Sequence, residues 1–497
     1  MGKGIGSSRP RAAAERLGEL AEDRHRFLDK QVLLTGEAEV LGTQNGKICF
    51  DAALRLLPRL CPNVTVWVPA GVDDVREVAE RVARQTVFGP AIEFVDAPRS
   101  LDRFAAILNV GHRCRTDLPW TAVTSHGWLA RVSSSGRELL GVCDQTNPIG
   151  AMFATSLGVA DVFKRLIHLK PTRGSLFDAL TFSLWTYEAG STDPGPQLPQ
   201  SLAVDAVLVG AGAIGNAIAY LIGSLPVRGR IWIVDYQDFR DENLGTCILI
   251  GPGEVGASKA RFLAKWLESS LNAQGFPEKV SAFKLRLGHE MPYPSLILSA
   301  VDKIDARHQI QDIWPDLIID GAIGDFPCQV SRHPWEEDLA CMRCLFRQPV
   351  GASAETVASR ASGLRLDRVV NPFDLVSDED VASAPEGKRA FLRGRVGAQV
   401  CAVIAEAVAK ELSEDEQRAG FEPSVPFVAC LSACMVVAEM VKTLAGWDTA
   451  LDGRFQFDSL VGPARGLHFP QGRRADCICT ERRANIERVR RHRGQRS

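Results

Sequence analysis

The stretch "VLVGAGAIGNAIAYLIG", residues 207–223, begins as an apolar strand, passes through a glycine-rich turn and continues as a helix. Gly210, Gly212 and Gly215 have the G-x-G-x-x-G spacing, in which the glycines allow a tight turn, close approach of phosphate and close packing of helix on strand. Unpaired amides and the helix dipole favour an anion at this helix N-terminus. The stretch predicts a nucleotide-binding turn, which dehydrogenases and ATP-using enzymes share.

The residues around this turn alternate between strand and helix patterns, which is typical of a doubly wound α/β fold. Helices are expected to begin near Gly212 and to span Lys259 to Ser270. The expected strands are 205–210, 230–235, 279–287, 295–302 and 316–322. The sequence therefore predicts a Rossmann-like domain in the middle of the chain.

The N-terminal third has the same α/β rhythm, with strands expected at 30–36, 64–69 and 104–111. Its corresponding turn, "TGEAEVLG" at 35–42, lacks the glycine spacing. Glu37 and Glu39 place negative charge where backbone amides would meet an anion. We expect this third to bind no nucleotide.

Two apolar segments, 147–164 and 425–442, align with one constant offset. The offset pairs Pro148 with Pro426 and Lys164 with Lys442. Either two apolar helices resemble each other by chance, or a domain has been duplicated with one copy degenerate. We favour duplication, which predicts an internal pseudo-dimer.

Composition narrows the class of protein. The net charge of −2 predicts no nucleic-acid partner, and no run of about 18 uncharged apolar residues predicts a membrane span. The N-terminus lacks a secretory apolar core, so we expect a cytoplasmic protein. The arginine-rich end, 481–497, is expected to be a solvated, disordered tail. Thirteen cysteines in 497 residues are too few for a disulfide scaffold, so clustered pairs favour metal binding or catalysis.

Four polar residues follow the glycine turn in an informative order: Asp235 at a strand end, then Asn243, Lys259 and Asp302. A carboxylate at Asp235 suits a ribose diol. Hydride transfer by an NAD-dependent oxidoreductase leaves Lys259 and Asp302 unexplained. Adenylation of a carboxylate uses both, because a lysine neutralises charge on the α-phosphoryl group and an aspartate holds Mg²⁺.

These residues resemble the adenylation domain shared by ubiquitin-activating enzymes and the sulfur-carrier activators ThiF and MoeB. The resemblance covers about 204–345 and 423–480, and Asp302 with Arg307 matches the family's D-x-x-x-x-R context. One position departs, since Thr246 stands where the family has an arginine. The family also places an arginine ahead of the first strand, so the candidates for the missing charge are Arg240, Arg24 and Arg26.

Two cysteine pairs, Cys341 with Cys344 and Cys477 with Cys479, have the spacing of a structural Zn²⁺ site. The resemblance implies the same arrangement, although the second pair is C-x-C rather than C-x-x-C. Buried free thiols or a redox pair are the alternatives.

Cys401 lies after Gly397 in the expected first turn of a helix, where the helix dipole favours a thiolate. Packing beside Val400 and Ile404 is the structural alternative. In ubiquitin-activating enzymes the thioester-forming cysteine lies in an insertion between the first zinc-ligand pair and the crossover helix. Cys401 lies in the same interval of this chain, so the resemblance implies a catalytic role for Cys401. Cys328 is the second choice for a reactive thiol.

The chain thus resembles an activating enzyme for a ubiquitin-like protein, most closely those of bacterial antiphage conjugation operons. The resemblance implies ATP, Mg²⁺ and Zn²⁺, C-terminal adenylation, a thioester on Cys401 and transfer to a conjugating enzyme. The alternatives are sulfur-carrier activation, an NAD-dependent oxidoreductase and a non-catalytic scaffold. Association of two chains into a homodimer is left open by the sequence. The expected regions are an inactive domain (1–200), the active domain (201–350 and 423–480), the cysteine insertion (351–422) and the basic tail (481–497).

Overall fold

The computed structural model divides the chain into two compact units. Unit 1 comprises Met1–Phe346 and Pro423–Ser497, and unit 2 comprises Arg347–Glu422. The structure describes residues 8–86, 92–139, 145–336, 338–347, 354–371, 373–407 and 425–494.

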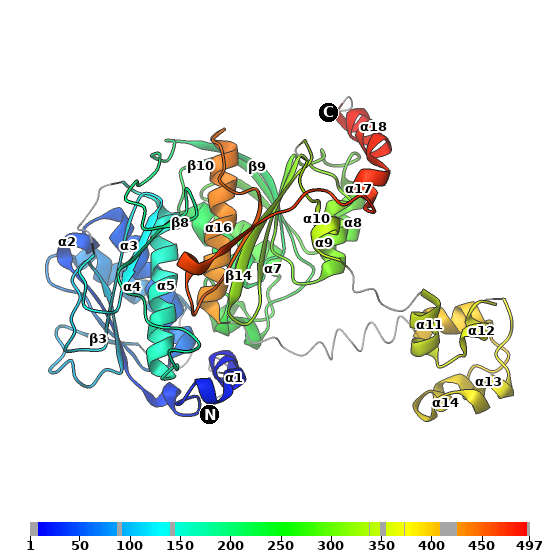
Figure 1. Cartoon of the computed structure of the whole chain (residues 1–497), viewed down its shortest axis with the longest axis horizontal. Helices are drawn as coiled ribbons and strands as arrows, with labels where there is room; N and C mark the ends of the chain where they lie inside the picture. Colours follow the sequence, from blue (N-terminus) through cyan, green and yellow to red (C-terminus); the bar gives the residue numbers. More distant parts are fainter. Residues whose placement is uncertain are drawn as a thin grey trace. The chain divides into compact units, whose positions relative to one another are not determined.

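The first half of unit 1 contains an eight-stranded sheet in the order β3-β2-β1-β4-β5-β6-β7-β8 (Figure 1). The strands from β3 to β5 are parallel, and β6 to β8 continue the sheet antiparallel. The bounds are β1 Val32–Gly36, β2 Val64–Trp67, β3 Glu93–Val95, β4 Ala106–Val110, β5 Trp120–His126, β6 Leu129–Ser133, β7 Leu180–Ser183 and β8 Glu188–Ala189.

The second half repeats this topology strand for strand, in the order β11-β10-β9-β12-β13-β14-β15-β16. Here too the first five strands across the sheet are parallel and the last three antiparallel. The bounds are β9 Leu202–Val209, β10 Val227–Val234, β11 Asn272–Phe276, β12 Leu296–Ser299, β13 Leu317–Ile323, β14 Pro327–Pro334, β15 Gly453–Asp458 and β16 Leu467–Pro470. The fold is thus α/β with two Rossmann-like domains, as the sequence predicted.

Helices cover the sheets and join the two halves. In unit 1 they are α1 Ser8–Arg16, α2 Ala38–Leu41, α3 Gln44–Leu60, α4 Asp73–Thr86, α5 Pro148–Leu166, α6 Ala213–Gly223, α7 Lys259–Leu267, α8 Val280–Arg286, α9 Ile304–Gln311, α10 Met342–Leu345, α16 Pro426–Leu444, α17 Ile478–Glu481 and α18 Arg483–Gly494. The two helices of the aligned segments, α5 and α16, pack against each other at the centre of the unit (Figure 1). Each begins with proline in its first turn, where a missing N–H costs nothing.

The matched positions of α5 and α16 also carry matched chemistry. In α5, Lys164 Nζ lies 2.8 Å from the carboxylate of Asp161, and in α16, Lys442 Nζ lies 2.8 Å from that of Glu439. All four side chains are buried. The helix α16 is long and apolar enough to cross a membrane by composition, but 89% of its apolar window is buried inside the protein, which is typical of a core helix.

One predicted strand is wrong. Residues 279–287 contain the helix α8, because their buried side chains, Val280, Phe283 and Leu287, follow helical spacing. Leu285, which suggested alternation, is 79% exposed. The strand in this part of the sheet is β11, whose sequence NAQGF has little apolar character.

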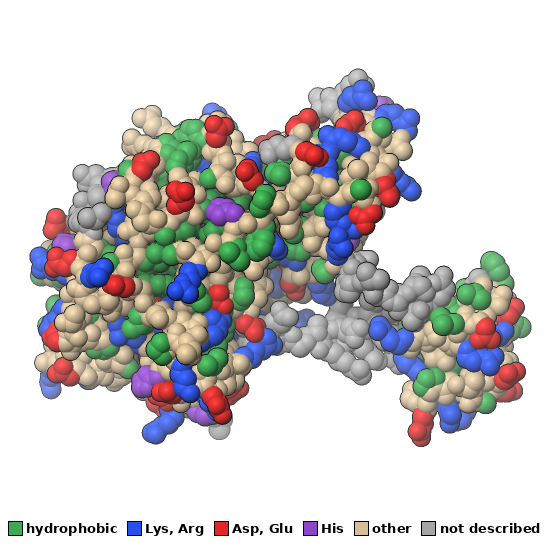
Figure 2. Space-filling view, viewed as in Figure 1, with side chains coloured by type: hydrophobic (Ala, Val, Ile, Leu, Met, Phe, Trp, Pro, Cys, Tyr) green, Lys and Arg blue, Asp and Glu red, His purple; other side chains and the backbone are tan. Residues whose placement is uncertain are grey.

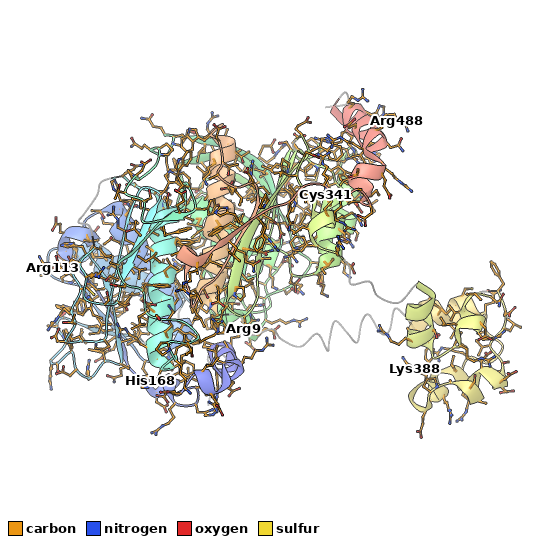
Figure 3. The ribbon with its side chains drawn as sticks, viewed as in Figure 1. Arg9, Arg113, His168, Cys341, Lys388 and Arg488 are labelled. Carbon is orange, nitrogen blue, oxygen red and sulfur yellow. The ribbon has the colours of Figure 1, made fainter. Side chains whose placement is uncertain are left out.

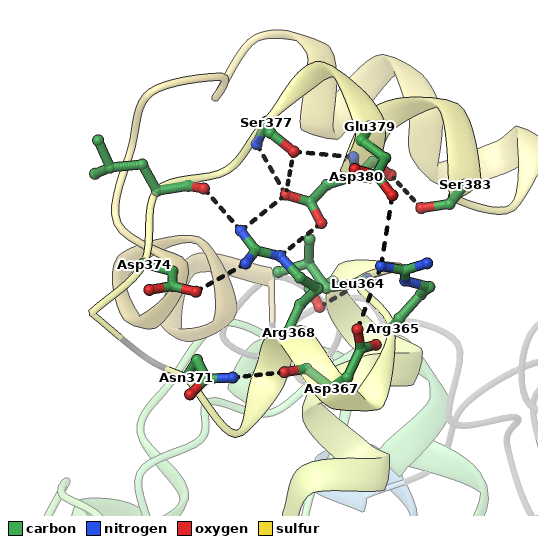
Figure 4. Close-up of polar contacts among 12 residues, drawn as sticks. Leu364, Arg365, Asp367, Arg368, Asn371, Asp374, Ser377, Glu379, Asp380 and Ser383 are labelled. Carbon is green, nitrogen blue, oxygen red and sulfur yellow. Dashed lines mark hydrogen bonds and ion pairs between the residues drawn. The ribbon is translucent and has the colours of Figure 1, made fainter.

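Unit 2 consists of α11 Ala354–Ser362, α12 Leu366–Val369, α13 Asp378–Ser383, α14 Glu386–Arg393 and a helical segment at 400–407. Its helices surround a small apolar core that includes Leu364, Leu392 and Val400. The guanidinium of Arg368 lies 2.8 Å from carboxylate oxygens of both Asp374 and Asp380, and donates to the carbonyl of Leu375 (Figure 4).

The basic C-terminal end is helical over α18, so the expectation of a disordered tail is wrong for its described part. Figure 2 shows Lys and Arg side chains gathered over this helix. Two contacts hold α18 against the rest of unit 1: Arg493 donates to the carbonyl of Ile313, and Arg490 forms an ion pair with Asp316.

Candidate functional site

Each glycine of the turn between β9 and α6 has its own steric reason. Gly210 has φ of 94°, and a Cβ there would lie 2.5 Å from the carbonyl oxygen of Ala300. A Cβ on Gly215 would lie 2.1 Å from the carbonyl oxygen of Gly210. A Cβ on Gly212 would meet nothing within 4 Å, so this glycine leaves space rather than relieving a clash. That open space at a helix N-terminus is where a phosphate would approach.

Asp235, directly after β10, is bonded to the turn. Its carboxylate accepts hydrogen bonds from the N–H of Ala211 at 2.7 Å and the N–H of Gln237 at 2.8 Å. The side chain is half-buried. A carboxylate has about four acceptor positions, so these two bonds leave capacity for a ribose diol.

Lys259 begins α7 and is 5% exposed. Its Nζ donates to Oε1 of Gln237 at 2.7 Å, and among the described residues it forms no ion pair with a carboxylate. Because its partner is a neutral amide, the ammonium keeps its charge for an anion. Gln237 therefore links Lys259 to Asp235, a role that the sequence did not indicate.

Asn243 belongs to the 3₁₀ helix η3, Asp241–Gly245, and its Oδ1 accepts from the N–H of Arg240 at 2.9 Å. Thr246 follows η3 and is buried. The structure therefore gives Asn243 a local partner, and the hydrogen bond to Arg240 fixes the entry to η3.

Asp302 is exposed, three residues after β12 ends. Arg307 donates from Nη1 to the carbonyl of Asp302 at 3.0 Å, and its Nε lies 3.2 Å from the buried carboxylate of Asp320. Burial raises the pKa of Asp320 to about 6. Arg307 thus holds the loop and leaves the Asp302 carboxylate open to solvent.

Arg9 on α1, labelled in Figure 3, is an arginine of the N-terminal half whose helix packs against η3. Burial lowers its pKa, and the nearby groups Cys247 and Glu242 act in the opposite direction. Arg24, a candidate from the sequence, instead donates to the carbonyl of Gly18 in its own segment. Arg9 is the better candidate for the charge missing at Thr246.

The corresponding turn of the first half is filled by a side chain. Glu37 accepts hydrogen bonds at Oε1 from Asn109 Nδ2 and from the N–H of Arg113, both at 2.9 Å. Its Oε2 lies 2.9 Å from Nδ1 of His112. A carboxylate therefore occupies the end of β1, where the second half has open space.

The four cysteines of the two pairs meet in unit 1, with all sulfur atoms within 4.8 Å of one another and all four residues buried. The Sγ separations are 3.7 Å for Cys341 to Cys344, 3.7 Å for Cys341 to Cys477 and 3.5 Å for Cys344 to Cys479. Hydrogen bonds from Cys341 and then Cys479 lower the pKa of Cys344. Each pair starts a short helix, α10 or α17 (Figure 1).

These distances fit a tetrahedral metal. Four sulfurs bonded to zinc at about 2.3 Å lie about 3.8 Å from one another. Despite the C-x-C spacing of the second pair, both Cys477 and Cys479 lie beside a cysteine of the first pair. The cluster is closed by Trp335 and Ile486, so a bound ion would have a structural role.

Cys401 is half-buried in the first turn of the segment 400–407. The core positions beside it are Val400 and Val403, so the thiol itself is not a core residue. The N–H of Val400 donates to the carbonyl of Asp374, in the loop that Arg368 holds. Cys328, the second choice, is 1% exposed, and burial raises its pKa, which argues against a nucleophile.

Sequence reasoning missed the contacts between the halves. Arg55 and Arg59 on α3 donate to carbonyls of residues 247–250 in the second half. Arg55 also pairs with Asp51, which accepts from the hydroxyl of Tyr220 on α6 at 2.7 Å. Two arginines four apart on an apolar helix were the available sign, because such residues are rarely buried without partners.

Comparison with known proteins finds similarity over most of the chain to the uncharacterized protein y4jF of Sinorhizobium fredii, 26% identical over 486 residues, which are 91% of this chain and 90% of that protein. The adenylyltransferase and sulfurtransferase MOCS3 of Caenorhabditis briggsae is 28% identical over 156 residues, 30% of this chain and 38% of MOCS3, so the match spans well under half of that relative.

Among solved structures, Escherichia coli MccB with MccA-N7isoASN matches with a TM-score of 0.37 at 15% identity, covering 56% of this chain and 66% of MccB. The ThiF family model matches residues 197–479, which is more than half of the chain and contains the glycine turn, Lys259 and all four clustered cysteines. The chain belongs to the ThiF family.

Proposed function

We propose that this protein activates a ubiquitin-like protein with ATP: it adenylates the C-terminal carboxylate, takes the acyl group onto Cys401 as a thioester and passes it to a conjugating enzyme. Membership of the ThiF family and the relation to MOCS3, named as an adenylyltransferase, support the adenylation step. The proposal assigns 1–200 to a half without nucleotide, 201–350 and 423–480 to the active half, and 351–422 to the insertion, in a cytoplasmic, bacterial defence setting.

The observation that carries the proposal is the ammonium of Lys259. It is buried, held by the neutral Gln237 and linked through it and Asp235 to the glycine turn. A cation that has no carboxylate partner among the described residues, and that lies beside an anion-binding turn, stabilises charge that grows on a phosphoryl group. A dinucleotide-dependent oxidoreductase gives this lysine no task.

In the first step the substrate carboxylate attacks the α-phosphorus of ATP, and the bond from that phosphorus to the bridging oxygen of the β-phosphate breaks. Pyrophosphate leaves and an acyl-adenylate remains. Gly210, Gly212 and Gly215 shape the phosphate turn, Asp235 and Asn243 face the nucleoside, and Lys259 and Arg9 neutralise phosphate charge. The exposed carboxylate of Asp302 would hold Mg²⁺, which would supply positive charge to the phosphates.

In the second step the sulfur of Cys401 attacks the acyl carbon, its proton is lost to solvent and AMP departs with the electron pair of the broken C–O bond. The half-exposed position of the thiol on a folded module supports this role. The cysteine cluster is proposed to bind Zn²⁺ and to tie α17 and α18 to the active half.

Activation of a sulfur carrier is the second candidate, favoured by the sulfurtransferase in the name of MOCS3. It shares the adenylation step and needs no thioester on Cys401. The two functions therefore differ in whether a thioester forms between the substrate and Cys401, and a non-reducing gel detects that conjugate.

The test incubates the purified chain with ATP, Mg²⁺ and a ubiquitin-like protein tagged at its N-terminus. We expect pyrophosphate exchange and a thiol-sensitive conjugate that Cys401→Ser abolishes. Cys114→Ser is the matched control, because Cys114 is also a half-exposed thiol but lies in the first half. Exchange without a conjugate would favour sulfur-carrier activation, and absence of both would refute the proposal.

A further inference from the structure

We propose that Arg59, in the first half, is a positioning residue for the nucleotide turn of the second half. The inference rests on the proposed function, because it takes the turn between β9 and α6 as the place where ATP phosphates bind. It assigns a task to the half that does not bind nucleotide.

The path begins where α3 meets the segment 247–250. Nη2 of Arg59 donates to the carbonyl of Cys247 at 3.0 Å and to that of Ile250 at 2.7 Å. The arginine is 6% exposed and residues 247–250 are buried, so these bonds are shielded from water. A charged donor on two carbonyls in this setting fixes the backbone between them.

The path continues from this segment to Asn216 on α6. The N–H of Leu249, between the two carbonyls held by Arg59, lies 3.4 Å from Oδ1 of Asn216. Nδ2 of Asn216 donates to the carbonyls of Ala211 and Gly212 at 3.1 and 3.3 Å. Asn216 is fully buried, so the structure offers its amide no water as an alternative partner.

The last contact sets the direction of the amides that would bind phosphate. In a planar trans peptide the C=O and N–H point in opposite directions. Since Asn216 draws the carbonyls of Ala211 and Gly212 toward itself, the N–H groups of Gly212 and Ala213 point away from it. These amides lie at the start of α6, where an anion is stabilised.

An ion pair between the halves, Arg173 with Asp458, provides a control. Arg173 Nη2 lies 2.7 Å from a carboxylate oxygen of Asp458 on β15, and among the described residues its side chain contacts Asp458 and Phe326 rather than the segment 247–250. If Arg59 only held the halves together, loss of either arginine would have a similar effect. If Arg59 positions the turn, only its loss weakens nucleotide binding.

The experiment measures ATP affinity of the full chain by calorimetry in excess Mg²⁺, with the melting temperature of each variant alongside. We expect Arg59→Met to bind ATP about tenfold more weakly, which is within the range of coupling through packed contacts. Arg173→Met should stay within about twofold of the wild type. Unchanged affinity in Arg59→Met, or equal losses in both variants, would overturn the inference.

A double-mutant cycle tests the path itself. Because Arg59 and Asn216 act in series, we expect Arg59→Met combined with Asn216→Ala to bind no more weakly than Asn216→Ala alone. Additive losses would contradict a shared path.

A milder variant guards against misfolding of Arg59→Met. Arg59→Lys keeps the charge but not the fork of donors, so we expect about a threefold loss at an unchanged melting temperature. Wild-type affinity in Arg59→Lys, when Arg59→Met does not fold, would overturn the inference. A wild type that binds no ATP would refute the proposed function, whereas ATP binding indifferent to Arg59 would refute only the positioning role.

Discussion

The two halves of unit 1 share a strand order and a central helix with a buried acid–lysine pair, yet they differ at the turn after the first strand. In the second half that turn has open space at Gly212, and in the first half the carboxylate of Glu37 fills the corresponding place. The shared features lie in the core, and the difference lies at the carboxyl end of an interior strand, β1 or β9. The packing is therefore alike in both halves, while the open glycine turn occurs in one of them.

The largest expected effect concerns the shared core. Lys164→Met and Lys442→Met each leave a buried carboxylate, and breaking a buried pair costs about 3 to 5 kcal/mol. We expect Lys164→Met to lose more stability in urea unfolding, because Glu439 keeps the guanidinium of Arg332 at 3.5 Å. Adding Asp161→Asn to Lys164→Met should restore part of the loss. Equal losses in the two halves would show that Arg332 contributes nothing.

The next effect separates the halves by chemistry. We expect Lys259→Ala to lower substrate-dependent pyrophosphate exchange by about 10² to 10³-fold, since it removes a preorganised charge from the phosphate site. Lys265→Ala, an exposed lysine on the same helix, is the matched control. Wild-type exchange in Lys259→Ala would show that Lys259 does not act on the phosphates, and would contradict the distinction drawn between the two halves.

We expect low pH to lower the stability of the protein through His333 on β14. The strand β6, which has the same place in the first sheet, contains no histidine. Burial lowers the pKa of His333 to about 4, so at pH 5 the unfolded chain binds a proton that the native chain does not. From pH 7 to pH 5 this costs about 2 kcal/mol of stability. Unfolding of His333→Gln at both pH values should show a smaller loss; an identical pH dependence would contradict the assignment.

The smallest effect tests whether the first half is closed to nucleotide by one residue. Glu37→Ala removes the acceptor for Asn109 and for the N–H of Arg113, which we expect to cost about 1 to 2 kcal/mol in thermal unfolding. Calorimetry should still give one ATP per chain, because the glycine spacing is absent. A second bound ATP would show that Glu37 alone distinguishes the halves.

Local patterns predicted the features that depend on neighbouring residues. Strands such as β9 and β13 are mostly apolar and are each followed by a glycine, and the glycine turn has fixed spacing. The segment 279–287 was misread because FKLRL alternates like a strand, while burial follows Val280, Phe283 and Leu287. Short segments of this kind are decided by the surface that they pack against.

Contacts between distant segments were less accessible. The aligned helices predicted the duplication, but nothing in the sequence placed Arg9 rather than Arg24 near η3, because that choice depends on how α1 folds back. Arg59 and Gln237 were overlooked for the same reason, since their partners are a carbonyl and a lysine defined only by tertiary structure. The clustering of Cys341, Cys344, Cys477 and Cys479 was easier to predict, because closely spaced cysteine pairs in a chain without a disulfide scaffold favour metal binding or catalysis.

The packing of α5 against α16 within one polypeptide has a consequence for enzyme behaviour in dilute solution. Separate subunits dissociate when their concentration falls below the dissociation constant, whereas covalently joined copies keep a fixed effective concentration. Dilution therefore cannot separate the two copies, which stay paired one to one at any protein concentration.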